Sequence, residues 1–117
     1  MALKRIILEM GAGNDLHGGD YTKAALRAVQ DALHHSSLAF IRSLKLDIHA
    51  MQVAVTIGVQ EPSKVDAERV RTSLPYGQVT VNVVKGGLDV PSEGGHDLAV
   101  IASAAIVVSF EMEGSAS

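Results

Sequence analysis

The chain has no cysteine and no tryptophan, and among its 117 residues there are only two tyrosines and two phenylalanines. The absence of cysteine excludes disulfide bonds, thiolate zinc sites and a cysteine nucleophile. With a formal net charge of −3, the chain has no excess of basic residues to bind the phosphate backbone of a nucleic acid. Four aromatic side chains are also too few to stack on a row of bases. We therefore expect no nucleic-acid partner.

The sequence also has little that would direct it to a membrane. Lys4 and Arg5 are not followed by an apolar region of signal-peptide length, because Glu9 and a glycine-rich segment interrupt it. The uncharged stretch Leu98–Phe110 contains several alanines and serines and is shorter than the roughly 20 residues that a membrane-spanning helix needs. We expect a cytoplasmic protein with no membrane partner.

Two helices are predicted. In Tyr21–Leu33 the apolar residues recur on one face and the charged residues on the opposite face, which is typical of an amphipathic helix, and Asp20 is placed to cap its N-terminus. A shorter helix is expected after Asp66, its N-cap, with Val65 packing on Val70 as a hydrophobic staple. Pro75 is expected to end this second helix.

Four strands complete the secondary structure. Gln52–Val59 and Gln78–Val84 alternate apolar residues with small or polar ones, which is typical of strands that bury one face. The apolar runs Ile6–Leu8 and Leu98–Phe110 are interpreted as the first and last strands, with Pro91–Gly95 as a loop. The resulting order, βαβαββ, predicts an α+β fold with a mixed sheet.

Both helices are expected on one face of that sheet, within a single domain at residues 1–112 that is followed by a disordered tail at 113–117. The other sheet face would then carry small or mildly polar residues such as Ala54, Thr56 and Thr80. Such a face suits the close approach of another sheet, so we expect a homo-oligomer.

The segment from Gly11 to Asp20 is the richest in chemistry, and we interpret it as a loop between a strand and a helix, where backbone N–H groups point outward. Asp15 and His17 are the candidate catalytic residues, because a histidine exchanges protons near neutral pH and a nearby carboxylate tunes it. The N–H groups of Gly13 and Gly18 can stabilise a developing anion. The expected ligand-binding residues of this segment are Gly11, Gly13, Asn14, Gly18 and Gly19.

Other interpretations of the same residues stay open. In a structural role, Asp15 caps N–H groups of its own loop and His17 donates to a backbone carbonyl. In a divalent-metal site for zinc, manganese or iron, the candidate ligands are Asp15, His17, His49 and His96, with Asp97 beside the last. A dinucleotide site is disfavoured, because the third glycine of its motif would fall at Leu16 and nearby carboxylates would repel a pyrophosphate.

Two residues elsewhere are further ligand-binding candidates. Tyr76 lies between Pro75 and Gly77 and can offer its hydroxyl to a ligand. His96 follows Gly94 and Gly95, whose backbone can approach a bound molecule closely.

The pattern Gly11-x-Gly13-x-Asp15-x-His17-Gly18 resembles the signature of a small family of uncharacterised bacterial and plant proteins defined by a GxGxDxHG motif. The similarity extends to Leu74-Pro75-Tyr76-Gly77 and to Val84-x-Gly86-Gly87-Leu88. This resemblance implies a conserved hypothetical protein and says little about function. The order of elements is also similar to the chorismate-mutase-like fold, which implies trimers with ligand sites in the clefts between subunits.

Three functional hypotheses follow. The first is an enzyme acting on a small molecule, a hydrolase, isomerase or lyase, with Asp15 and His17 as its acid–base pair at a subunit interface. The alternative is a non-catalytic oligomeric module that binds a metabolite or a metal. The third is an assembly protein whose glycine-rich segment serves only the packing of subunits.

Overall fold

The computed structural model describes residues 2–34, 50–74 and 77–112. Its elements in chain order are β1 (Ala2–Asp15), α1 (Tyr21–His34), β2 (Gln52–Val59), the 3-10 turn η2 (Pro62–Lys64), α3 (Ala67–Thr72), β3 (Gln78–Lys85), β4 (Leu88–Pro91) and β5 (Leu98–Met112). The predicted α+β fold is confirmed, with one strand more than the sequence indicated. His49, Pro75, Tyr76 and the predicted tail at 113–117 lie outside the described residues.

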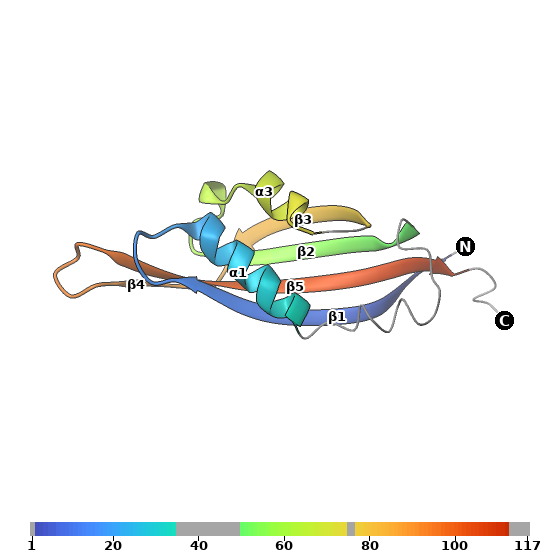
Figure 1. The fold of residues 1–117 in the computed structure, drawn as a ribbon, viewed down its shortest axis with the longest axis horizontal. Helices are drawn as coiled ribbons and strands as arrows, with labels where there is room; N and C mark the ends of the chain where they lie inside the picture. The colour runs from blue at the N-terminus through green and yellow to red at the C-terminus, as the bar shows by residue number, and fades with distance from the viewer. Residues whose placement is uncertain (1, 35–49, 75–76, 113–117) are drawn as a thin grey trace.

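The strands form one mixed sheet in the order β1-β5-β2-β3 (Figure 1). Strand β5 is the centre of this sheet. It pairs antiparallel with β1 along one edge, and along the other edge with β4 at Leu98–Ile101 and then with β2 at Ser103–Ser109. Strands β2 and β3 are parallel, as α3 lies in the connection between them.

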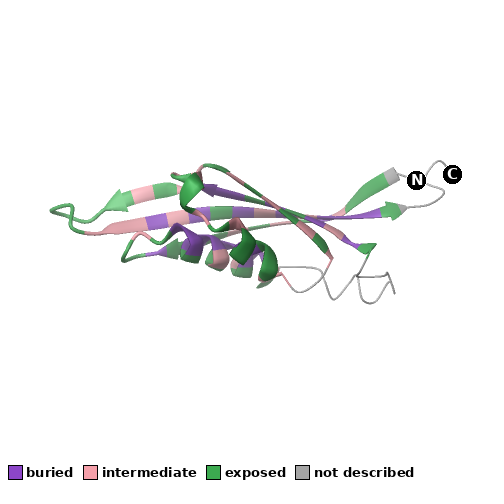
Figure 2. Ribbon diagram, turned by 90° about the horizontal axis from the view of Figure 1, so that it is seen from above, coloured by how far each residue is buried: buried purple, intermediate pink, exposed green. Residues whose placement is uncertain are grey.

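Helices α1 and α3 cover the same face of the sheet. Helix α1 packs on β1 and β5, and α3 packs on β3 and contacts α1. The core lies between the helices and the sheet, and Figure 2 shows the buried side of α1 turned toward the strands. Both predicted N-caps are confirmed, because Asp20 accepts from the Lys23 N–H at 3.0 Å and Asp66 from the Arg69 N–H at 3.2 Å.

Strand β1 is much longer than predicted and includes most of the glycine-rich segment. The expected loop at 11–20 is therefore wrong for residues 11–15, which pair with β5 as far as Asp15. A Cβ added to Gly11 would lie 2.4 Å from the backbone nitrogen of Ala32, and one added to Gly13 would lie 2.2 Å from that of Ala28. These two glycines let the backbone of α1 rest directly on the backbone of β1.

The same helix also protects the outer edge of β1. The Asp31 carboxylate accepts a hydrogen bond from the Ala12 N–H at 2.9 Å, and the Arg27 guanidinium donates to the Asn14 carbonyl at 2.7 Å. Unpaired backbone groups at a sheet edge invite pairing with another chain. Side chains of α1 occupy them here, so this part of the edge is not available to another strand.

Strand β4 was not predicted. The preceding strand was expected to end at Val84 and Pro91 to lie in a loop, whereas Leu88–Pro91 pairs with β5. Gly87 adopts a φ of +64°, and a Cβ there would lie 2.1 Å from the carbonyl oxygen of Ile101. A four-residue strand flanked by glycine and ended by proline carries too little pattern to be recognised.

In the described part of the chain, no helix is long and apolar enough to cross a membrane.

We predict that Gly13→Ala destabilises the protein by at least about 2 kcal/mol, because the new methyl group meets helix backbone that cannot move without displacing α1. Chemical denaturation followed by circular dichroism measures this change. The control is Ser63→Ala at an exposed position of the η2 turn, for which we expect a change within about 0.5 kcal/mol. Equal effects of the two substitutions would contradict the packing role of Gly13.

Candidate functional site

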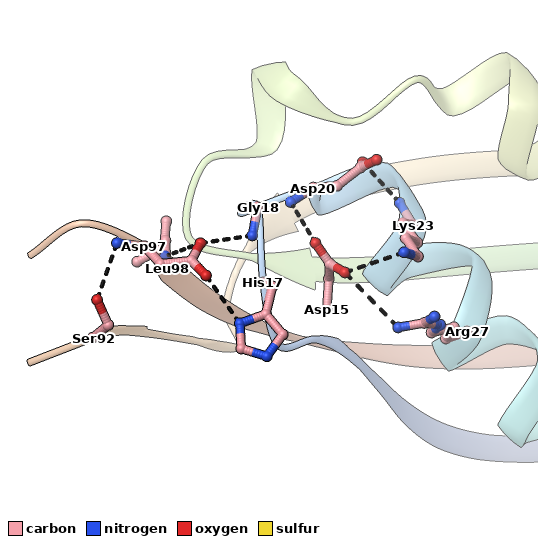
Figure 3. Close-up of polar contacts among 9 residues, drawn as sticks. All are labelled: Asp15, His17, Gly18, Asp20, Lys23, Arg27, Ser92, Asp97 and Leu98. Carbon is pink, nitrogen blue, oxygen red and sulfur yellow. Dashed lines mark hydrogen bonds and ion pairs between the residues drawn. The ribbon is translucent and has the colours of Figure 1, made fainter.

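The true loop of the glycine-rich segment, residues 16–20, is fastened to the start of β5 (Figure 3). The Gly18 N–H donates to Oδ1 of Asp97 at 2.7 Å, and the Gly19 N–H donates to the Leu98 carbonyl at 3.1 Å. Both glycines have positive φ, which a residue with a side chain rarely adopts. The Gly18 N–H expected to stabilise an anion is thus already bonded to a carboxylate, and Gly13 lies within the β1–β5 ladder.

Asp15 is buried, with 3% of its surface exposed, at the end of β1. Its Oδ2 accepts from the Asp20 N–H at 3.0 Å, while Oδ1 lies 3.5 Å from Lys23 Nζ and 3.9 Å from Arg27 Nη1. The Asp20 hydrogen bond and then the two cations hold the pKa of Asp15 below its ordinary value. Asp15 therefore caps its own loop as a carboxylate that is ionised at neutral pH, which is the role that the structural interpretation gave to this residue.

His17 turns away from Asp15 and pairs with Asp97, its Nδ1 lying 2.9 Å from Oδ2 (Figure 3). The pKa of Asp97 is lowered, first by the Gly18 N–H, then by His17 and by the Leu98 N–H. The His17 side chain is 87% exposed. The expected partners of His17, Asp15 or a backbone carbonyl, are thus replaced by a carboxylate that lies 80 residues further along the chain.

A solvent-open cleft of about 490 Å³ lies beside this loop. It is framed by the N-terminal end of α1, the η2 turn and the hairpin between β4 and β5, and its lining residues are Gly18, Gly19, Tyr21, Glu61, Lys64, Pro91, Gly95, His96, Asp97 and Leu98. Of the residues predicted to bind a ligand, Gly18, Gly19 and His96 line this cleft. Gly11, Gly13 and Asn14 belong to β1 and do not line it.

Tyr21, Glu61 and Lys64 also line the cleft, although none of them was a candidate from the sequence. The buried Tyr21 hydroxyl contacts Oε2 of Glu61 at 2.9 Å and also contacts Oδ2 of Asp89, and these contacts together with burial raise the pKa of Tyr21, the Asp89 hydrogen bond most. The hydrogen bond from the Tyr21 hydroxyl lowers the pKa of Glu61, and the Lys64 ammonium lowers it further. Oδ1 of Asp89 is buried and has no hydrogen-bond partner among the described residues.

The metal hypothesis gains no support from the described residues. Across residues 2–34, 50–74 and 77–112, no group of three histidine or acidic side chains is arranged to hold a metal ion. His17 and Asp97 do come together, but Asp15 is engaged with Lys23 and Arg27. His49 lies outside the described residues, so its part in the predicted ligand set stays a prediction.

We predict that Asp15→Asn lowers the thermal unfolding midpoint at neutral pH, because the charged cap of the loop is lost. A carboxyl whose pKa is depressed in the folded state stabilises the fold above its unfolded pKa, and that contribution disappears as the pH falls through the folded pKa. The difference between wild type and variant should therefore shrink below about pH 4. Thermal unfolding across this pH range measures it, with Glu93→Gln in the exposed β4–β5 turn as control. A difference independent of pH would refute the charged cap.

Comparisons with known proteins give the chain a family. It is similar, with a TM-score of 0.83 and 37% sequence identity, to the crystal structure of an FtsZ-like protein of unknown function from Nostoc punctiforme PCC 73102, over 96% of this chain and 99% of that chain. No curated protein matches it. A family model described as a conserved hypothetical protein, Lin0512, matches residues 5–108, so the expectation of a conserved hypothetical family is confirmed. The chain belongs to the Lin0512 family of conserved hypothetical proteins.

Proposed function

We propose that the protein is a binding module that holds a small polar molecule in the cleft between α1, η2 and the β4–β5 hairpin. The observation that carries this proposal is the convergence of Gly18 and Gly19 with Tyr21, Glu61 and His96 around one space of about 490 Å³. That volume lies within the range of roughly 300–1,000 Å³ that small-molecule sites occupy. Three separate segments of the chain meet there.

The charges at the cleft favour a ligand that carries an amine or other N–H donors. Glu61 and Asp97 are carboxylates with lowered pKa values, so both keep their charge at neutral pH. The Lys64 ammonium lies 3.3 Å from Oε1 of Glu61 and is balanced by it. A cationic group on the ligand can replace Lys64 at Glu61, and Asp97 adds a second carboxylate to the lining of the same cleft.

The protonation states of the site favour binding over catalysis. A useful acid or base gains and loses its proton near the working pH. Tyr21 keeps its proton because its pKa is raised, and Asp15 stays ionised because its pKa is lowered. Neither residue is suited to proton transfer at neutral pH, which argues against the Asp15 and His17 pair as the catalytic residues.

One geometry supports a second candidate function. An exposed imidazole whose Nδ1 lies 2.9 Å from a carboxylate has the arrangement of a general base oriented by an acid, and His17 and Asp97 form such a pair. In this candidate the predicted hydrolase, isomerase or lyase activity uses Asp97 in place of Asp15. His17 does not line the cleft, so the substrate of this candidate would lie beside the loop on the His17 side of Asp97. Turnover of a small molecule that is lost in His17→Gln while binding persists would favour it.

Several expectations from the sequence stay predictions. These are the GxGxDxHG motif as the defining signature of the family, the chorismate-mutase-like topology with trimers and clefts between subunits, and the cytoplasmic location. The strand order β1-β5-β2-β3 with helices on one face is the feature to compare in testing the topology.

The proposal is tested by titrating ¹⁵N-labelled protein with ethanolamine and arginine as amine probes and with acetate and phosphate as anionic probes. We expect the amines to shift the amide signals of Gly18, Gly19 and His96, and the anions to leave them unchanged. Glu61→Gln should weaken amine binding at least about tenfold, because a charge-assisted hydrogen bond is lost.

The matched control is Glu68→Gln, which removes an exposed carboxylate on α3 that pairs with Arg71 outside the cleft. It should leave amine binding unchanged. Anion binding at the same amides would overturn the ligand class, whereas the absence of any localised shift with all four probes would overturn the binding function.

A further inference from the structure

Among the described residues no element covers the sheet face opposite the helices, which we call the open face, and this face is apolar over most of its area. Side chains alternate along each strand, and cross-strand partners point to the same side of the sheet. Val100, Ala102, Ala104 and Ile106 of β5 are buried beneath the helices, so the residues between them point to the open face. The residues of this open face are Leu8, Met10, Ala12 and Asn14 of β1, Ala99, Ile101, Ser103, Ala105 and Val107 of β5, Ala54 and Thr56 of β2, Thr80, Asn82 and Val84 of β3, and Leu88 and Val90 of β4.

None of these residues is charged; the nearest charges that the register places on the same side are Arg5 of β1 and Glu111 of β5, beyond Leu8 and Val107 at the far end of the sheet. The large side chains of the open face are strongly exposed, with Met10 at 66%, Leu88 at 60%, Val90 at 53% and Leu8 at 49%. Scattered exposed apolar residues are ordinary on a protein surface, but here they share one continuous sheet face. A continuous apolar surface of this kind is typical of a surface that is covered by a binding partner.

The area of the open face is close to what a stable interface needs. Along β5, from Ala99 to Val107, it extends for about 30 Å at ~3.3 Å per residue. It is three strands wide beside β4 and four strands wide beside β2 and β3, which at ~4.8 Å per strand makes it about 15 to 20 Å wide. Its projected area of roughly 500 Å² approaches the ~800 Å² of accessible surface that each partner contributes to a standard interface. The accessible area of a corrugated sheet exceeds its projection, so the two values are comparable.

We infer that a second copy of this chain covers the open face, sheet against sheet. Two sheets pack about 10 Å apart when their facing residues are apolar or small, and the centre of this face carries Ala12, Ala105 and Thr56 between larger residues at both ends. The partner must itself be flat and uncharged, and the same face of another copy meets both conditions. The open face would then be the contact surface of the homo-oligomer that was expected from the sequence.

The other occupants fit less well. A membrane surface favours apolar faces rimmed by lysine and arginine, whereas this chain has a net charge of −3. Strand addition at the outer edge of β1 is blocked near Ala12 and Asn14, where side chains of α1 bind the backbone. Pairing at the outer edge of β3, at the other end of the sheet order, would leave the apolar face uncovered, so only a face-to-face contact buries that face.

Sedimentation velocity over a concentration series, with native mass spectrometry of the same sample, tests this inference. We expect the wild-type protein to be a dimer or a higher oligomer and Met10→Lys to raise the dissociation constant at least tenfold. Because Met10 is exposed in the single subunit, the lysine reaches water there, and circular dichroism should show a folded variant.

Thr72→Lys, at the exposed end of α3 on the opposite side of the sheet, is the control and should assemble like the wild type. Leu88→Lys provides a second, independent probe at the other end of the open face. A monomeric wild-type protein, or an oligomer that is unchanged by both lysines on the open face, would overturn the inference.

Discussion

The direct contact between the backbones of α1 and β1 brings the charged side chains of α1 to the edge and the end of β1. Gly11 and Gly13 leave no room for a Cβ, so the helix lies as close to the strand as two backbones allow. At that distance Arg27 and Asp31 reach the outer edge of β1, and Lys23 reaches Asp15. A larger side chain on β1 would lift the helix away and break these contacts together.

The same contact forces the chain to turn sharply between the end of β1 and the start of α1. Gly18 and Gly19 make this turn. Their N–H groups donate to the Asp97 carboxylate and to the Leu98 carbonyl at the start of β5. Asp97 is central to this junction because it binds the loop backbone, the His17 ring and its own strand. The cleft exists because the loop, the η2 turn and the β4–β5 hairpin are held at this one end of the sheet.

Most of the fold could be predicted from local patterns, whereas most of the site could not. The alternation in β2 and β3 and the apolar stripe of α1 indicated the correct elements, because each pattern repeats within one segment. Gly11 and Gly13 were assigned to a loop, although their spacing of two, combined with the alanines of α1, is the signal of a strand in close contact with a helix. Tyr21, Glu61 and Asp89 meet only through the tertiary fold, and no short motif connects them.

Strand β4 connects the cleft to the open face. Its residues alternate, so Asp89 points toward Tyr21 on the helix side while Leu88 and Val90 point to the open face. A second copy packed on Leu88 and Val90 would hold the hairpin from one side, and a ligand at Tyr21 and Asp97 would hold it from the other. Two binding events that order the same element favour each other, and this coupling is reciprocal. Assembly and ligand binding are therefore expected to strengthen one another through this short strand, even though their surfaces lie on opposite faces of the sheet.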